Sequence, residues 1–133
     1  MDARGLQQYK AQSLNTMTQQ ELLLLLLDEL VKRTLRSELA LEQEDYPLFE
    51  ASIDRCIEIV RYLDRTLNRK YDVSRNLHRM YEFFCYDFNR IKLGRNKAEL
   101  DRIRPMIVDL RDAFRSADHR AVADTGGGAN GLP

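Results

Sequence analysis

The side chains best suited to chemistry in this chain are two cysteines and two histidines. Cys56 and Cys85 lie in separate apolar stretches, without the close spacing of a metal or redox motif. Metal-binding helical bundles place a Glu three residues before a His, but the positions before His78 and His119 hold an arginine and a serine. We therefore expect thiols that pack in a core, histidines on the surface, no catalytic residue, no metal and no cofactor. The chain is not expected to be an enzyme.

The composition supports one small globular domain. The 133 residues carry 21 basic and 21 acidic side chains, a balance that disfavours a strongly basic nucleic-acid binder. Four of the six glycines lie in the last eight residues, so no glycine-rich phosphate loop or many-stranded β fold is expected. The leucine run at 22–27 is much shorter than the roughly 20 apolar residues of a membrane span. With no signal-peptide pattern, the expected location is cytoplasmic, without membrane insertion.

Capping residues and hydrophobic periodicity predict where the first two helices begin. Thr18 and Glu21 form a capping box, and the helix after them meets no breaker before about residue 44. Asp45 is a suitable N-cap for a second helix, in which Pro47 is tolerated in the first turn. Apolar residues then recur every three or four positions as far as Leu67, a pattern typical of a helix packed in a bundle.

Two further helices follow from the same signals. A third helix is predicted over residues 73–93, with Gly94 at the C′ position, where a positive φ is often needed. Asn96 then provides the N-cap of a fourth helix, whose apolar positions again recur every three or four residues. Pro105 lies off that apolar seam, and we expect a kink there that bows toward solvent.

These elements predict an all-α fold, an antiparallel four-helix bundle over residues 18–120. Residues 1–17 are expected to form a short N-terminal flap that packs on the bundle, and residues 121–133 a disordered tail. The first half of the chain has an excess of acidic side chains and the second half an excess of basic ones. This asymmetry has two interpretations: helical hairpins of complementary charge, or a basic patch for an acidic partner.

The chain has more apolar surface than one core can bury. Six consecutive leucines surround the whole circumference of a helix, so Leu24 and Leu25 must point partly away from the core. Five of the eleven aromatic residues lie at 81–88, where Phe83 and Tyr86 fall off the seam. The extra side chains could be covered by the chain's own ends or scattered singly on the surface. They could also form a groove for a partner helix.

Four segments then appear in an order that resembles a known family. Residues 9–22 contain a tyrosine, a Thr-rich helix cap and Glu-Leu, and residues 25–28 end the apolar run in Asp. Residues 76–83 read Asn-Leu-x-x-Met-Tyr-x-Phe, and residues 110–114 read Leu-Arg-Asp-Ala-Phe. Their order and spacing resemble the flagellar secretion chaperone family FliS, although Phe replaces that family's usual closing Trp.

The resemblance implies a cytosolic four-helix-bundle chaperone that holds flagellin as a monomer before export. In such a protein the disordered C-terminal segment of flagellin folds into helices as it wraps the bundle, and the complex is recognised by the export gate. The N-terminal segment around Tyr9 can cover part of the groove until the client displaces it. Sequestration of this kind is driven by mass action and requires no nucleotide.

The candidate partner-binding residues lie in the flap and on three of the helices. Tyr9 and Phe83 are supported by motif matches, and the others by leftover apolar surface. The full set is Leu6, Tyr9, Leu24, Leu25, Val31, Ile59, Tyr62, Phe83 and Tyr86.

Two alternatives remain open at this point. One is a structural homo-oligomer formed through the extra leucines, although a monomer or weak homodimer is expected. The other is a binder of nucleic acid or an anionic surface, although the aromatic residues do not alternate with basic ones as in a single-strand platform. Its contacts would be Arg90, Lys92, Arg95, Lys97, Arg102 and Arg104.

Overall fold

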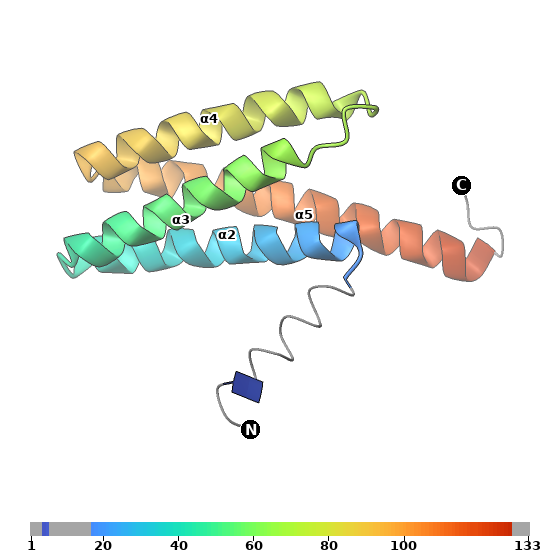
Figure 1. The fold of residues 1–133 in the computed structure, drawn as a ribbon, viewed down its shortest axis with the longest axis horizontal. Helices are drawn as coiled ribbons and strands as arrows, with labels where there is room; N and C mark the ends of the chain where they lie inside the picture. Colours follow the sequence, from blue (N-terminus) through green and yellow to red (C-terminus); the bar gives the residue numbers. More distant parts are fainter. Residues whose placement is uncertain (1–3, 6–16, 129–133) are drawn as a thin grey trace.

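A computed structural model of the chain describes residues 4–5 and 17–128, with side chains as far as residue 118. It contains four long helices, which confirms the predicted all-α class (Figure 1). Their bounds are α2 (Gln19–Glu42), α3 (Tyr46–Arg65), α4 (Val73–Gly94) and α5 (Lys97–Gly128).

The predicted flap at residues 1–17, with Leu6 and Tyr9, lies almost entirely outside the described residues. At the other end α5 continues to Gly128, beyond the boundary expected at residue 120, and residues 129–133 lie outside the description. Pro105 is exposed within α5, consistent with its place off the apolar seam, and helix continues on both sides of it. The kink expected there stays a prediction.

The three N-caps predicted from sequence are present. Thr18 Oγ1 accepts a hydrogen bond from the Glu21 amide at 3.0 Å. The Asp45 carboxylate accepts one from the amide three residues further on at 3.2 Å, and the Asn96 side chain does the same at 3.1 Å. Each cap satisfies an amide that the helix itself leaves unpaired, which contributes about 1 kcal/mol.

The end of α4 differs from the prediction by one residue. Gly94 is the last residue of the helix, and Arg95 takes the left-handed conformation with φ 48°. Because the helix is one residue longer than expected, the cap falls on Arg95, and the Asn96 amide donates to Ile91 O at 3.2 Å. The Arg95 guanidinium also lies 3.6 Å from the ring centroid of Tyr46, a cation–π contact that helps offset the strain.

The helices form an antiparallel bundle. Each helix packs on the next in sequence, and α2 also packs on α5, with α4–α5 the least extensive of the four interfaces. Glu38 near the end of α2 lies 3.4 Å from Lys97 at the start of α5. Asp28, nearer the start of α2, lies 2.7 Å from Arg115 far along α5. Figure 1 shows the same reversal of direction at each connection.

Ion pairs join the acidic first half of the chain to the basic second half. Besides the α2–α5 pairs, Asp54 of α3 lies 2.7 Å from Lys92 of α4. These pairs support the interpretation of two hairpins with complementary charge. Exposed pairs of this kind contribute little stability, on the order of 0–1 kcal/mol each, but they favour one register of the helices over others.

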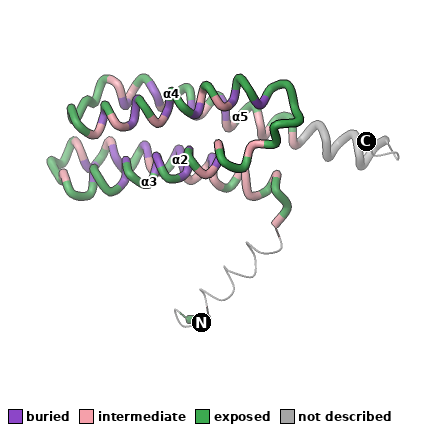
Figure 2. The backbone as a smooth tube through the Cα atoms, turned by 45° about the horizontal axis from the view of Figure 1, so that its top comes forward, coloured by how far each residue is buried: buried purple, intermediate pink, exposed green. Residues whose placement is uncertain are grey.

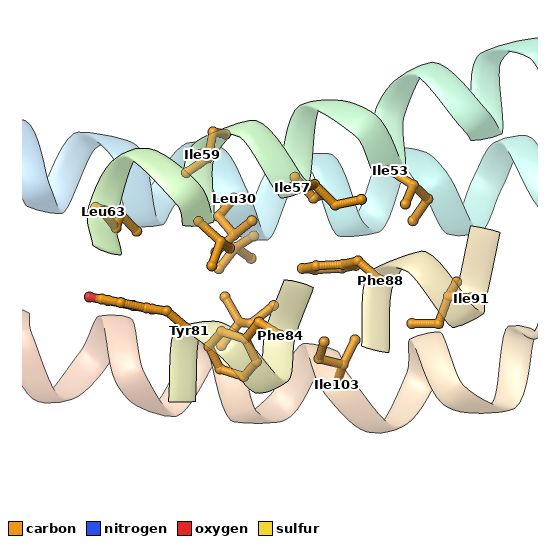
Figure 3. Packing of buried hydrophobic residues seen from close by; sticks show 14 of the residues in the cluster. Leu30, Ile53, Ile57, Ile59, Leu63, Tyr81, Phe84, Phe88, Ile91 and Ile103 are labelled. Carbon is orange, nitrogen blue, oxygen red and sulfur yellow. The ribbon is translucent and has the colours of Figure 1, made fainter. Parts of the chain in front are cut away.

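The core follows the predicted seams of α3, α4 and α5. Figure 2 shows buried positions recurring along the helices, with exposed positions between them. Figure 3 shows aliphatic and aromatic side chains from facing helices meeting in the centre. The fully buried side chains at the centre include Phe49, Ile53, Cys56, Val60, Phe84, Phe88, Ile91, Leu100, Ile103 and Ile107.

The first helix is oriented differently from the prediction. The spacing of Leu23, Leu26, Leu30 and Leu41 predicts all four on the core seam. Leu30 is fully buried, and so is Leu27, but Leu23, Leu26 and Leu41 are only half-buried. Six identical side chains carry no periodicity, so the sequence could not show which of them faces inward.

Small residues continue the buried face of α2. Thr34, Ser37 and Ala40 are buried. Thr34 Oγ1 donates to Val31 O at 2.6 Å, so this hydroxyl enters the interior with its hydrogen bond made.

Candidate functional site

Three of the four residues singled out for chemistry have described side chains, and all three contact other parts of the bundle; the side chain of His119 lies outside the described residues. Cys56 lies in the core, and burial raises the pKa of its thiol to about 12. Cys85 is half-buried, and burial also raises its pKa. His78 lies between two carboxylates, with Nδ1 2.6 Å from Asp64 Oδ1 and Nε2 2.9 Å from Glu82 Oε1. No group of three or more metal-ligating side chains occurs in the described part of the chain.

The two thiols are expected to react at different rates. At pH 8 a thiol reagent should modify Cys85 in the native protein and reach Cys56 only after unfolding, because the thiolate of a buried, high-pKa cysteine is scarce and inaccessible. Absorbance assays of thiol release in buffer and in denaturant measure this difference. A Cys85→Ser variant is the control and should show no reactive thiol before denaturation. Equal rates for both thiols in the native protein would contradict the assigned burial.

An apolar cavity lies at the end of the bundle where α2 and α4 begin and α3 ends. Its volume is about 560 Å³. Polar side chains of Gln19, Gln20, Thr66, Asn68 and Ser74 contribute to its lining. The larger, mainly apolar part of the lining comes from all four helices and the α3–α4 connector: Leu22, Leu23, Leu26, Tyr62, Leu63, Leu67, Tyr71, Val73, Leu77, Tyr81 and Phe114. We call this feature the end cavity.

A second hollow adjoins the first. It has a volume of about 460 Å³ and lies between the first turns of α2 and the last turns of α3. Its apolar residues are Leu22, Leu26, Ile59 and Tyr62, and its charged residues are Arg55, Glu58, Arg61 and Arg65. We call it the α2–α3 groove. Because Leu22, Leu26 and Tyr62 line both hollows, the two form one continuous apolar surface.

The structure gives different positions to the candidate residues of α2 and α3. Tyr62 lines both hollows, and the largely buried Ile59 lies at the bottom of the α2–α3 groove. Leu25 is 42% exposed and Leu24 half-buried, so both point partly away from the core as predicted, but neither lines a hollow. Val31 is only 8% exposed and belongs to the core. It was selected as leftover surface, and this is corrected because α2 packs on both α3 and α5.

The aromatic candidates on α4 lie elsewhere. Phe83 is 43% exposed and Tyr86 64% exposed, as their positions off the seam predicted, and neither lines the end cavity or the groove. The ring centroids of Phe83 and Phe84 lie 6.1 Å apart, and the Arg90 guanidinium lies 5.8 Å from the ring centroid of Tyr86. Leu6 and Tyr9 remain predictions, since both lie outside the described residues.

Several residues that line the two hollows were not among the candidate partner-binding residues predicted from the sequence. Leu22, Leu26 and Phe114 lie within the motifs that carried the family resemblance, so a signal for them existed. Leu67, the last residue of the apolar repeat predicted for the second helix, lies just beyond α3 in the α3–α4 connector. Tyr71, in the same connector, had no signal, because periodicity says nothing about a side chain outside a helix.

The basic residues proposed for nucleic-acid binding are engaged within the chain. Lys92 pairs with Asp54, Lys97 with Asp101, and Arg90 with Asp87. Arg102 pairs with Glu99 and Arg104 with Glu38, while Arg95 lies over Tyr46. These six side chains therefore form no free basic patch, which disfavours the nucleic-acid alternative.

The fold and the hollows define a class: a four-helix-bundle protein with an apolar cavity and an adjoining groove at one end of the bundle. Among the described residues, no helix is both long and apolar enough to span a membrane. The family model described as flagellar protein FliS matches residues 2–121, and the chain belongs to this family. It is similar to the flagellar secretion chaperone FliS of Bacillus subtilis (strain 168), with 26% identity over 109 residues that cover 82% of each chain. These findings confirm the resemblance seen in the sequence: the chain is a member of the FliS family of flagellar secretion chaperones.

Proposed function

We propose that this protein binds the C-terminal segment of flagellin in the cytoplasm, keeps the subunit from polymerising, and assists its delivery to the export gate. The observation that supports this proposal is the continuous apolar surface of the end cavity and the α2–α3 groove, which the described residues leave open. Family membership supplies the flagellar export context.

The energetics of such binding require many apolar contacts. A disordered segment that folds on binding loses conformational entropy, which buried apolar area must offset. Burial of one Leu or Phe side chain contributes about 1.5–3 kcal/mol before that cost. The two hollows present leucine, isoleucine and aromatic side chains over a sufficient area for several such anchors.

The proposed contacts are centred on Tyr62, where the two hollows join. Leu24 and Leu25 on α2, and Phe83 and Tyr86 on α4, are proposed as further contacts for a client that continues around the bundle. Ile59 would contact the client only from the bottom of the groove. Leu6 and Tyr9 are proposed as flap residues next to the same surface.

Titration of the full chain with a flagellin C-terminal peptide tests the proposal. We expect saturable binding at micromolar or lower concentration, and about tenfold weaker binding for Leu22→Gln, because about 1.4 kcal/mol of apolar contact is lost from both hollows. Isothermal titration calorimetry measures both affinities.

The matched control is Leu39→Gln, on the same helix. Leu39 is 58% exposed and lines neither hollow, so this change should leave the affinity unaltered. Absence of saturable peptide binding to the unmodified chain would remove the proposal. Equal weakening by the two variants would show that the open end of the bundle is not the binding site.

A further inference from the structure

The charges around the α2–α3 groove are unbalanced. Arg55 is paired with Glu58 at 3.1 Å, which uses the one carboxylate that lines the groove. Arg61 and Arg65 form no ion pair within the described residues. Arg65 instead lies 5.7 Å from the ring centroid of Tyr62, and the positive charge of Arg61 lowers the pKa of the Cys85 thiol on α4, against the effect of burial. The groove lining therefore includes two arginines that have no carboxylate partner among the described residues.

These two arginines are placed to recognise a helix. Positions four residues apart on a helix are neighbours, with Cβ atoms about 5–6 Å apart, so Arg61 and Arg65 form a short row along α3. Leu22 and Leu26 have the same spacing on α2 and supply the apolar part of the groove. A helical segment that carries apolar anchors on one side and acidic side chains one turn apart beside them would match both rows.

We propose that the α2–α3 groove binds a partner helix of this acidic amphipathic kind, and that its charge pattern selects which segment of a client lies there. The inference rests on the proposed client-binding function and adds a specificity to it. Charge complementarity disfavours the chain's own first 17 residues as the occupant. They carry Asp2 against Arg4 and Lys10, a net positive charge that does not complement the two arginines.

The test uses two synthetic helical peptides with the same leucine anchors. One carries glutamates one turn apart beside the anchors, and the other carries glutamines at those positions. Fluorescence anisotropy of each labelled peptide with the full chain should give about fivefold tighter binding of the Glu peptide, a preference that fades as added salt screens the charges. The double variant Arg61→Gln/Arg65→Gln should remove the preference, and Arg61→Lys/Arg65→Lys should keep it.

The chain offers a matched control for this change. Lys32 and Arg36 are also exposed, four residues apart, and without an ion pair in the described part of the chain, but they line neither hollow. Lys32→Gln/Arg36→Gln alters net charge equally and should leave the preference intact. Circular dichroism and the thermal midpoint show whether each variant is folded.

Every other outcome overturns the inference. Equal binding of the two peptides, or binding of neither, would show that the groove does not select a helix by its charge. The preference for the Glu peptide could also survive in the Arg61→Gln/Arg65→Gln variant, or fall by the same factor in the Lys32→Gln/Arg36→Gln control. Either result would show that the preference comes from the overall charge of the protein and not from the groove. Because these peptides contain no flagellin sequence, failure here leaves the flagellin titration unaffected, and failure there leaves this measurement interpretable.

Discussion

Replacement of Phe88 by alanine is expected to lower the free energy of unfolding by about 3–5 kcal/mol, the largest effect anticipated for a single substitution in this chain. Phe88 is fully buried on α4, and its ring points into the centre of the bundle (Figure 3). Truncation removes the favourable transfer of the ring from water and leaves a cavity that helices on several sides cannot fill by collapsing.

Urea denaturation followed by circular dichroism measures this loss, and Phe83→Ala is the matched control. Phe83 lies on the same helix but is 43% exposed, so its truncation should cost less than about 1 kcal/mol. Phe88→Leu keeps most of the volume and should cost less than about 1.5 kcal/mol. A loss below about 1 kcal/mol for Phe88→Ala would show that the centre of the bundle is not packed as described.

Replacement of Asp87 by asparagine is expected to stabilise the protein at pH 8 by about 1–3 kcal/mol and to have little effect at pH 4. Asp87 is buried at the α4–α5 interface. Burial, followed by a hydrogen bond with the Glu99 carboxyl, raises the pKa of Asp87 from 3.8 to about 6, although the Arg90 guanidinium 3.7 Å away opposes the rise.

The direction of the pH effect follows from proton binding. Between pH 4 and 6 the folded protein holds a proton on Asp87 that the unfolded chain has released, so stability falls as pH rises through this range. Above pH 6 the penalty for burying the charge is fully present, and below pH 4 it is absent. Asparagine carries no charge and escapes the penalty at every pH.

Urea denaturation of the unmodified protein and the variant at several pH values measures this effect. Asp109→Asn is a control, since Asp109 is exposed and lies on α5, the helix that packs against α4 near Asp87. Its substitution should change stability by no more than about 0.5 kcal/mol at any of these pH values. A difference between Asp87→Asn and the unmodified protein that stays constant from pH 4 to pH 8 would show that Asp87 does not titrate as assigned.

The helices and their starts were predictable because their causes are local. Thr18, Asp45 and Asn96 each cap a helix through an amide only three residues away. The buried seams of α3, α4 and α5 follow from the 3.6-residue repeat of a helix. The end of α4 shows the limit of such reasoning, because one additional helical residue moved the left-handed cap from Gly94 to Arg95.

The orientation of α2 was not predictable for a related reason. Any rotation of α2 about its axis would turn leucines toward the core, because the run places leucine on every face of the helix. Contacts with α3 and α5 therefore decide that Leu27 is buried while Leu25 is exposed. The same contacts bury Val31, and those of α3 bury Ile59, although both had been considered leftover surface.

The sequence by itself therefore determined where the four helices begin, the N-caps of three of them, the complementary charge of the two halves and the excess of apolar side chains. Only the tertiary structure decided where that excess lies. The end cavity joins Leu22, Tyr62, Tyr71 and Phe114 from four distant segments. The α2–α3 groove beside it is lined by Arg61 and Arg65, which form no ion pair with any residue that the structure describes. Hydrogen bonds within a helix connect residues three or four positions apart, whereas a cavity depends on how side chains from separate helices fill or fail to fill the space between them.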